Sequence, residues 1–288
     1  MEFLQPSSWR EALEAKAAHP DALAIAGGTD VMVDLNFDRG RPPAIIDLGR
    51  VRELEGFERE DGGLLLGARI TYTQAIEWLG ELAPGLAIAS RTVGSPQIRN
   101  RGTIGGNLGS ASPAGDAHPP LLAAKAEVEV ASVRGSRRLP VAEFFLGPKR
   151  SALAPDELVA AVRLPAAGGP QQFAKIGPRN AMVIAVCSLA LELDPVRRRV
   201  GTGIGSAGPT PLVAGEAERF LEGVLDSEGL WESRGPLGES AVGRFAELVA
   251  AAARPIDDVR GSAAYRRHAL AVLARRALGW AWDRYRRG

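Results

Sequence analysis

Residues 102–116 constrain the fold more than any other stretch, because the sequence GTIGGNLGSASPAGD offers few side chains that could fill a core. Glycine has no Cβ and tolerates positive φ, so a run of glycines lets the backbone approach another molecule closely. Asp116 ends the run with a carboxylate. We expect this stretch to add almost nothing to the core and to be either a flexible linker or a ligand-binding segment.

A second glycine-rich segment, AGGTD at 26–30, follows a short apolar run and precedes a helical pattern. In it and in TIGGN at 103–107, consecutive backbone N–H groups can point at one anion, and a helix behind the segment adds a favourable dipole. Either segment alone is also compatible with an ordinary turn. Together they predict a grip on the two phosphates of a pyrophosphate, with Asp116 placed to bind sugar hydroxyls.

Residues 203–208, GIGSAG, match the G-x-G-x-x-G dinucleotide fingerprint letter for letter. That fingerprint must open a helix whose N-terminus holds the pyrophosphate. Here Pro209 and Pro211 follow at once and disfavour a helix. We therefore reject a Rossmann interpretation of this run. A P-loop is also absent from the sequence, because no G-K-[ST] follows a glycine run.

Charge and rare residue types exclude several classes of function. The chain has 35 Lys and Arg against 34 Asp and Glu, whereas a nucleic-acid-binding protein usually carries a basic excess. One cysteine, Cys187, cannot form an internal disulfide or hold an iron–sulfur cluster, and three histidines disfavour a dedicated metal site. No serine stands in a G-x-S-x-G elbow, so we expect no catalytic side chain. Without a signal peptide or a membrane-spanning run, we expect a cytoplasmic protein.

Hydrophobic periodicity predicts an α+β chain of three units. In the first unit, 1–55, a capping box at Ser8–Glu11 opens a helix over 8–18, and two short strands follow. The middle unit, 56–167, is expected to contain a hairpin turn at Asp61-Gly62-Gly63, a helix capped by Thr73, a helix after Pro84 and strands at 127–133 and 157–165. A boundary at 166–170 precedes a C-terminal α+β domain over 171–288, which begins with an antiparallel meander and is then mostly helical.

Four landmarks together resemble the flavoprotein (medium) subunit of molybdenum hydroxylases of the carbon monoxide dehydrogenase and xanthine dehydrogenase family. They are AGGTD at 26–30, SPQIRNRGTIGGNLGSASPAGD at 95–116, FFLGPKRSALAPDELV at 144–159 and PIDDVRGSAAYRRHALAVLARRAL at 255–278. The resemblance covers essentially the whole chain, with the landmarks in the family's order. It implies that FAD binds between the first two units, in a two-part fold of the vanillyl-alcohol-oxidase (PCMH) type, and that a C-terminal α+β domain follows.

The resemblance also implies roles for single residues. The two glycine-rich segments would hold the pyrophosphate, and Asp116 would bind a hydroxyl of the sugar or ribityl chain. Lys175 matches a lysine near the pyrimidine edge of the flavin, where a positive charge stabilises the anionic reduced ring; the alternative is an exposed strand lysine. The implied FAD-binding set is Ala26, Gly27, Gly28, Thr29, Asp30, Gly94, Ser95, Ile98, Thr103, Ile104, Gly105, Gly106, Asn107, Ser112, Asp116, Leu146, Gly147 and Lys175. Of these, Gly94, Ser95 and Ile98 could instead only brace the segment that follows them.

By the same resemblance, the chain is the electron-transfer subunit of a heterotrimer that forms a dimer of heterotrimers. A molybdopterin-binding large subunit would oxidise the substrate, and a [2Fe–2S] small subunit would pass electrons to the FAD and on to NAD, a quinone or oxygen. Two alternatives are a stand-alone FAD-dependent oxidoreductase and a nucleotide-binding or assembly protein without redox function. One departure stands out: relatives often carry an acid in Arg-x-x-x-Asp-Ile-Ala, where this chain has Val183.

Overall fold

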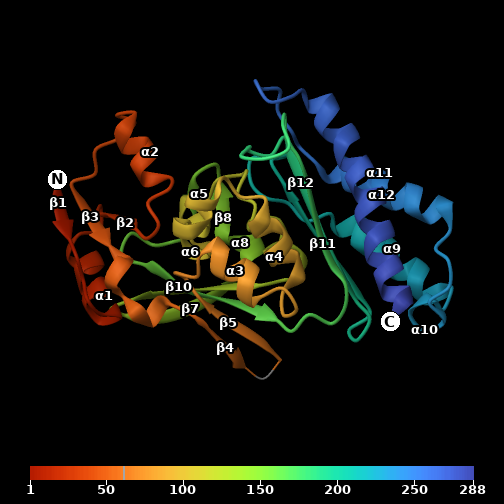
Figure 1. Ribbon diagram of the computed structural model, residues 1–288, viewed down its shortest axis with the longest axis horizontal. Helices are drawn as coiled ribbons and strands as arrows, with labels where there is room; N and C mark the ends of the chain where they lie inside the picture. The colour runs from red at the N-terminus through yellow and green to blue at the C-terminus, as the bar shows by residue number, and fades with distance from the viewer. Residues whose placement is uncertain (61) are drawn as a thin grey trace.

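The computed structural model describes residues 1–60 and 62–288, which follow one another as three parts along the long axis of the molecule (Figure 1). The N-terminal part lies at one end and the C-terminal helices lie at the other. Asp61, the first residue of the expected hairpin turn, lies outside the described residues. The strands on either side of it pair antiparallel, from Phe57↔Leu66 to Glu60↔Gly63.

The N-terminal part is a small parallel sheet in the order β1–β3–β2. Its elements are β1 (Glu2–Leu4), α1 (Trp9–Ala18), β2 (Leu23–Ile25), α2 (Val31–Asn36), β3 (Ala44–Asp47) and the short 3-10 turns Leu48–Arg50 and Arg52–Leu54. Ser8 caps α1 as expected, because its side chain accepts from the N–H of Glu11. The carboxylate of Glu11 returns to the N–H of Ser7, not of Ser8, so the expected capping box is shifted by one residue. Strand β1 was not expected.

The middle part is a five-stranded antiparallel sheet in the order β4–β5–β10–β6–β7, with helices packed against it. The strands are β4 (Phe57–Glu60), β5 (Gly63–Gly67), β6 (Glu127–Ser132), β7 (Gly135–Pro140) and β10 (Leu158–Pro165). The helices are α3 (Tyr72–Trp78), α4 (Pro84–Arg91), α5 (Pro96–Arg101), α6 (Ile104–Ser110) and α7 (His118–Ala123), followed by the short α8 (Val141–Phe144) and the hairpin of β8 (Phe145–Gly147) and β9 (Arg150–Ser151). Thr71 caps α3 with a capping box to Gln74, so the expectation for Thr73 was wrong.

Residues 104–110 of the glycine-rich run form α6 and are partly buried, so the expectation that the run adds almost nothing to the core was wrong. Thr103 caps α6 by accepting from the N–H of Gly106, and Ile104 and Leu108 have no exposed surface. A Cβ at Gly105 would lie 2.5 Å from the Cβ of Ala68 and 2.6 Å from its carbonyl oxygen. The missing side chain therefore lets α6 pack directly on the end of β5, which outweighs the low helix propensity of glycine.

The C-terminal part is an antiparallel meander with helices on one face (Figure 1). Its strands are β11 (Gln171–Ile176), β12 (Cys187–Asp194) and β13 (Arg199–Gly205), and its helices are α9 (Gly215–Ser227), α10 (Leu230–Ser233), α11 (Glu239–Ala252) and α12 (Ala263–Arg287). The next helix after β13 begins only at Gly215, so the rejection of a Rossmann motif at 203–208 is confirmed. A large hydrophobic core lies between this sheet and helices α9, α11 and α12.

Helix α7 of the middle part packs on the other face of this sheet, over β13. A Cβ at Gly201 would lie 2.0 Å from the carbonyl oxygen of Ala123, and one at Gly203 would lie 2.0 Å from that of Pro119. The glycines of this strand thus serve the close approach of a helix, which is a packing role. The same contact fixes the middle and C-terminal parts against each other.

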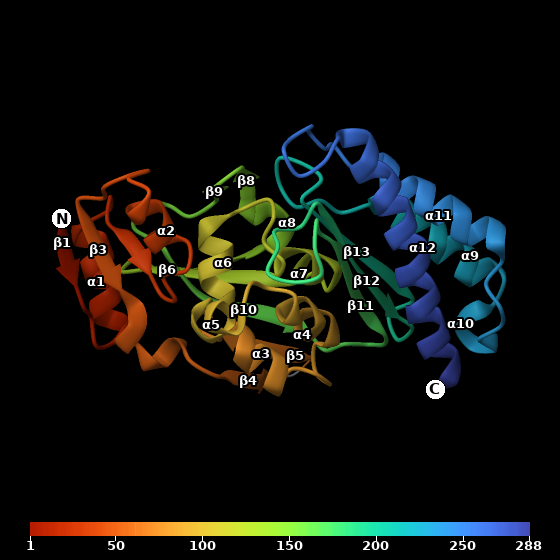
Figure 2. The ribbon, with the colours of Figure 1, turned by 45° about the horizontal axis from the view of Figure 1, so that its top comes forward.

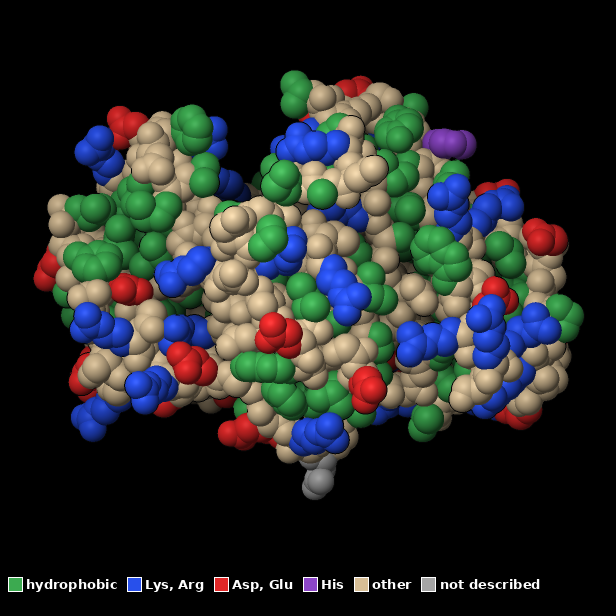
Figure 3. Space-filling model, in the orientation of Figure 1, with side chains coloured by type: hydrophobic (Ala, Val, Ile, Leu, Met, Phe, Trp, Pro, Cys, Tyr) green, Lys and Arg blue, Asp and Glu red, His purple; other side chains and the backbone are tan. Residues whose placement is uncertain are grey.

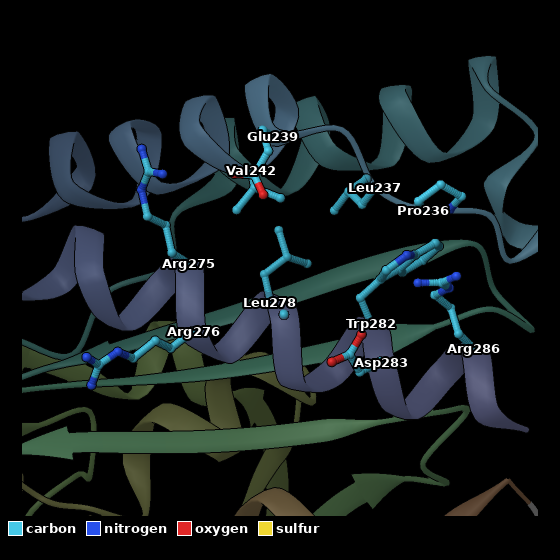
Figure 4. Close-up of a pocket in the computed structure, with 11 residues that line it drawn as sticks. Pro236, Leu237, Glu239, Val242, Arg275, Arg276, Leu278, Trp282, Asp283 and Arg286 are labelled. Carbon is cyan, nitrogen blue, oxygen red and sulfur yellow. The ribbon is translucent and has the colours of Figure 1, made fainter.

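One groove of about 420 Å³ opens between α11 and α12 (Figure 4). Leu278 and Trp282 lie along it, and Arg275 and Arg286 point from α12 near its two ends. It shares no residue with the glycine-rich segments, so it is separate from the predicted FAD site. No helix of the described part of the chain is long and apolar enough to cross a membrane.

Candidate functional site

The two glycine-rich segments meet in the structure. A Cβ at Gly27 would lie 1.9 Å from the carbonyl oxygen of Arg101 and 3.0 Å from the Cα of Gly102. Any side chain at Gly27 would therefore push the AGGTD segment away from the residues that lead into α6. Gly28 has φ +77°, a left-handed conformation that other residues adopt at a cost. Figure 2 shows α2 in the N-terminal part and α6 in the neighbouring middle part, and each helix follows one of the two segments.

The AGGTD segment offers backbone donors that the protein does not use. Among residues 1–60 and 62–288, the N–H groups of Gly27, Gly28 and Thr29 donate to no backbone or side-chain acceptor. These three residues are partly exposed. Consecutive free N–H groups on an open loop can bond the oxygens of an anion.

The TIGGN segment differs from the expectation, because four of its five N–H groups are engaged within the protein. Ile104 donates to the carbonyl of Ile70 and Gly105 to that of Ala68, each at 2.9 Å. Gly106 donates to Thr103 Oγ1 at 2.9 Å, and Asn107 donates to the carbonyl of Thr103 at 3.0 Å. In this segment only the N–H of Thr103 has no acceptor among the described residues. The second segment therefore offers a close surface and the side chain of Asn107, while most of the free N–H donors belong to the first segment.

Lys175 and Asp116 form a buried ion pair. Lys175 Nζ lies 2.5 Å from Asp116 Oδ2 and 2.9 Å from the carbonyl oxygen of Thr92. Only 6% of the Lys175 side chain and 8% of the Asp116 side chain are exposed, so Lys175 is not the exposed strand lysine that remained as an alternative. Burial raises the pKa of Asp116, and the charge and hydrogen bond of Lys175 and a hydrogen bond from Thr92 act in the opposite direction.

Three buried acceptor atoms around Gly115 have no partner among the described residues: Asp116 Oδ1, Asn107 Oδ1 and His118 Nδ1. A Cβ at Gly115 would lie 2.7 Å from His118 Nδ1 and 2.8 Å from Asn107 Nδ2, so these side chains surround that glycine. Burial lowers the pKa of His118 to about 4, and its Nε2 lies 3.0 Å from the carbonyl oxygen of Asn107. The ring is thus neutral near pH 7, and its Nε2 donates to that carbonyl. Such a set suits the hydroxyl donors of a polyol and would repel a phosphate.

Tyr72, which sequence reasoning missed, lies against the residue that leads into the TIGGN segment. Its ring lies beneath Gly102, where a Cβ would be 3.1 Å from Tyr72 Cε2. Burial, together with the nearby carboxylates of Asp116 and Asp30, raises the pKa of the Tyr72 hydroxyl well above its usual value. The phenol therefore stays neutral. No local sequence signal marks Tyr72, because its role depends on contacts with residues far away in the chain.

The remaining predicted residues lie around the same region in different roles. Ser95 caps α5 by accepting from the N–H of Ile98, and Gly94 has φ +41° just before this cap. These contacts fit the alternative that Gly94, Ser95 and Ile98 brace the segment that follows them. Ser112 Oγ accepts from the N–H of Ala114 inside the turn that leads to Asp116. Leu146, 59% exposed, and Gly147 lie on β8.

The hairpin of β8 and β9 reaches both α6 and α2. The N–H of Lys149 donates to the carbonyl of Ala111, and Lys149 Nζ lies 3.2 Å from Asp34 Oδ2. Figure 3 shows the surface hollowed between the part that carries α2 and the C-terminal part.

At the departure from the family pattern, where relatives often carry an acid, a Cβ at Gly177 would lie 2.4 Å from Val183 Cγ1, so Val183 packs on the loop backbone. No cluster of three metal-ligating side chains occurs in residues 1–60 and 62–288.

Comparison with known proteins gives matches along the whole chain. Residues 1–167 match the family described as FAD binding domain in molybdopterin dehydrogenase, and residues 172–281 match the CO dehydrogenase flavoprotein C-terminal domain. The xanthine dehydrogenase FAD-binding subunit of Escherichia coli O157:H7 is 30% identical over 281 residues, which cover 93% of this chain and 91% of that protein. The nicotine 6-hydroxylase medium subunit of Paenarthrobacter nicotinovorans is 30% identical, with 96% and 95% covered. A chain of carbon monoxide dehydrogenase from Hydrogenophaga pseudoflava has a TM-score of 0.89 at 28% identity, with 99% and 98% covered.

Proposed function

The chain belongs to the family of FAD-binding medium subunits of molybdenum hydroxylases, and we propose that it binds FAD between its first two parts and transfers electrons within a heterotrimer. The resemblance inferred from the sequence and the α+β fold with its C-terminal flavoprotein domain are confirmed. The chain is accordingly an oxidoreductase flavoprotein subunit. The individual FAD contacts and the route of the electrons are our proposal.

The observation that carries this proposal is the match between unused polar atoms and the groups of FAD. The AGGTD segment has free N–H donors, as a pyrophosphate requires. The turn at 112–118 has buried acceptors without partners, as the hydroxyls of a ribityl or ribose chain require. We assign the pyrophosphate to Gly27, Gly28 and Thr29, and the hydroxyls to Asp116 and Asn107. Since buried polar atoms without partners cost free energy, a ligand that satisfies them binds tightly.

In this arrangement Lys175 would place a fixed positive charge beside the flavin, held at its Nζ by Asp116 and Thr92. FAD, when bound, accepts single electrons and passes on pairs, and the protein contributes orientation and electrostatics. We propose that a [2Fe–2S] partner subunit supplies the electrons, that a molybdopterin-binding partner oxidises the substrate, and that NAD, a quinone or oxygen is the final acceptor. The hydroxylase activity thus belongs to the complex, with this chain as its flavin carrier.

Spectroscopy of the purified chain tests the proposal directly. After incubation with excess FAD and desalting, we expect the chain to keep a flavin absorbance, and acid release followed by chromatography to identify FAD. Mixing with the dithionite-reduced [2Fe–2S] partner subunit should bleach that absorbance faster than mixing with the oxidised subunit. A folded chain that keeps no flavin, alone or in the assembled complex, would contradict FAD binding. Retention of an adenine nucleotide without flavin would favour an assembly protein, and substrate turnover by the isolated chain would favour a stand-alone oxidoreductase.

A further inference from the structure

Arg266, near the start of α12, is a buried cation that connects distant parts of the chain. Only 3% of the residue is exposed. Its guanidinium donates from Nη1 to the carbonyl of Ser206 at 2.6 Å and from Nη2 to Asp258 Oδ1 at 2.6 Å. Asp258 also accepts from the N–H of Arg260 at Oδ1 and from the side chain of Arg260 at Oδ2, each at 2.8 Å, so both carboxylate oxygens are held. Arg266 is thus fixed where β13 ends.

Ser206 continues this chain of contacts into the proposed FAD site. Its N–H donates to the carbonyl of Pro113 at 2.9 Å, and Pro113 belongs to the turn that carries Ser112 and Asp116. Ser206 also has φ +57°, a left-handed conformation in a residue other than glycine, and its buried hydroxyl has no partner among the described residues. Such a conformation persists only where surrounding contacts enforce it. The hydrogen bonds of Ser206 to Pro113 and Arg266 are contacts of this kind.

We propose that Arg266 is a positioning residue of the FAD site: by holding Ser206 in its left-handed conformation, it sets the turn that places Asp116. This inference rests on the proposed function, since it concerns the same FAD site. Arg266 touches no predicted FAD-binding residue, and it acts through Ser206 and Pro113. The run at 203–208 has no dinucleotide-binding role of its own. In this proposal it is the link between α12 and the turn that carries Asp116. Helix α12 then contributes to cofactor binding without contacting the cofactor.

Removal of Arg266 leaves Ser206 free to relax toward right-handed backbone angles, which withdraws its N–H from Pro113. We expect Arg266→Met to raise the FAD dissociation constant about tenfold, as loss of a supporting partner does at other sites. The affinity is measured by titrating the full-length apo-protein with FAD and following flavin fluorescence. Arg267→Met is the matched control, because Arg267 is the exposed neighbour on the same helix and forms no ion pair within the described residues. We expect it to bind FAD with unchanged affinity.

A second substitution separates positioning from a merely structural role. Glycine adopts positive φ without cost, so Ser206→Gly alone should keep FAD affinity, and the double variant Arg266→Met/Ser206→Gly should bind more tightly than Arg266→Met. A structural role of Arg266 would lower the melting temperature without this recovery. If Arg266→Met fails to fold, Asp258→Asn, which weakens the same ion pair, should show a smaller loss of affinity and the same recovery.

The outcomes distinguish this inference from the proposed function. Failure of the wild-type chain to bind FAD overturns both. Wild-type binding with equal affinity in Arg266→Met overturns only the positioning role. A weakened Arg266→Met whose affinity is not improved by Ser206→Gly overturns the coupling through Ser206, and the inference with it.

Discussion

Lys175→Met is expected to lower the free energy of unfolding by about 3–5 kcal/mol near neutral pH, because it leaves the buried carboxylate of Asp116 without its cation. The pair is almost fully removed from solvent, with 6% and 8% of the side chains exposed, so water does not replace Lys175. Thr92 gives the carboxylate only a 3.4 Å contact. Chemical denaturation of the apo-protein, followed by circular dichroism, measures the change.

The pH dependence of this effect has a definite sign. Burial raises the pKa of Asp116 in the folded state, and removal of Lys175 raises it further. A group whose pKa is higher in the folded state destabilises the fold as pH rises through that pKa. The destabilisation by Lys175→Met should therefore be largest above the raised pKa and should shrink as the pH falls below it. If Lys175→Met lowered the unfolding free energy by the same amount above and below the raised pKa of Asp116, a charged, unpaired Asp116 would not be the cause of the loss.

Two control variants isolate the contribution of the buried pair. In Lys175→Met/Asp116→Asn the uncompensated charge is gone, so most of the lost stability should return. Lys149→Met removes a lysine whose ion pair with Asp34 is exposed, with 67% and 38% of the side chains accessible, and it should cost under about 1 kcal/mol. If the double variant were no more stable than Lys175→Met, lost packing of the lysine side chain would explain the effect.

The fold could be predicted from the sequence wherever a local signal decided the structure. Ser8 opens α1, and the alternation at 127–133 became β6, because side-chain capping and burial on one face act over a few residues. The run at 102–110 was misjudged because glycine content indicates flexibility only when no other element is close. Here β5 is close enough that Gly105 contacts Ala68, and this contact is invisible in the local sequence.

The candidate site could be predicted in part, mainly through the resemblance. Asp116 and Lys175 were both named, although 59 residues separate them, and their pairing is a property of the fold. Donors and acceptors could not be assigned from sequence, because the N–H groups of α6 are engaged by carbonyls of residues 68 and 70. Tyr72 was not named, and Arg266 was named only as part of the landmark at 255–278, since the role of each depends on tertiary contacts that no motif encodes.

Gly27→Ala is expected to weaken FAD binding by about 100-fold, equivalent to about 2.7 kcal/mol. The added Cβ would lie 1.9 Å from the carbonyl oxygen of Arg101. Because backbone atoms there cannot rotate away, the AGGTD segment must move from the residues before α6. The free N–H groups of Gly28 and Thr29 would move with the segment, away from Asp116 and Asn107. One FAD molecule could then no longer bond the N–H donors and the acceptors of Asp116 and Asn107 at the same time. Titration of the apo-protein with FAD gives the dissociation constant.

The choice of glycine matters for this test, because the glycines of the two segments have different roles. Substitution of Gly105 would disturb the packing of α6 on Ala68, so we expect Gly105→Val to impair folding, and it cannot test cofactor contact alone. Gly109 is the matched control: it is exposed on α6, and a Cβ there meets no atom within 4 Å. Gly109→Ala should keep FAD affinity and raise stability by up to about 1 kcal/mol. If Gly27→Ala bound FAD as tightly as Gly109→Ala, the contact between the two segments would have no part in holding the cofactor, and the pyrophosphate would have to lie elsewhere.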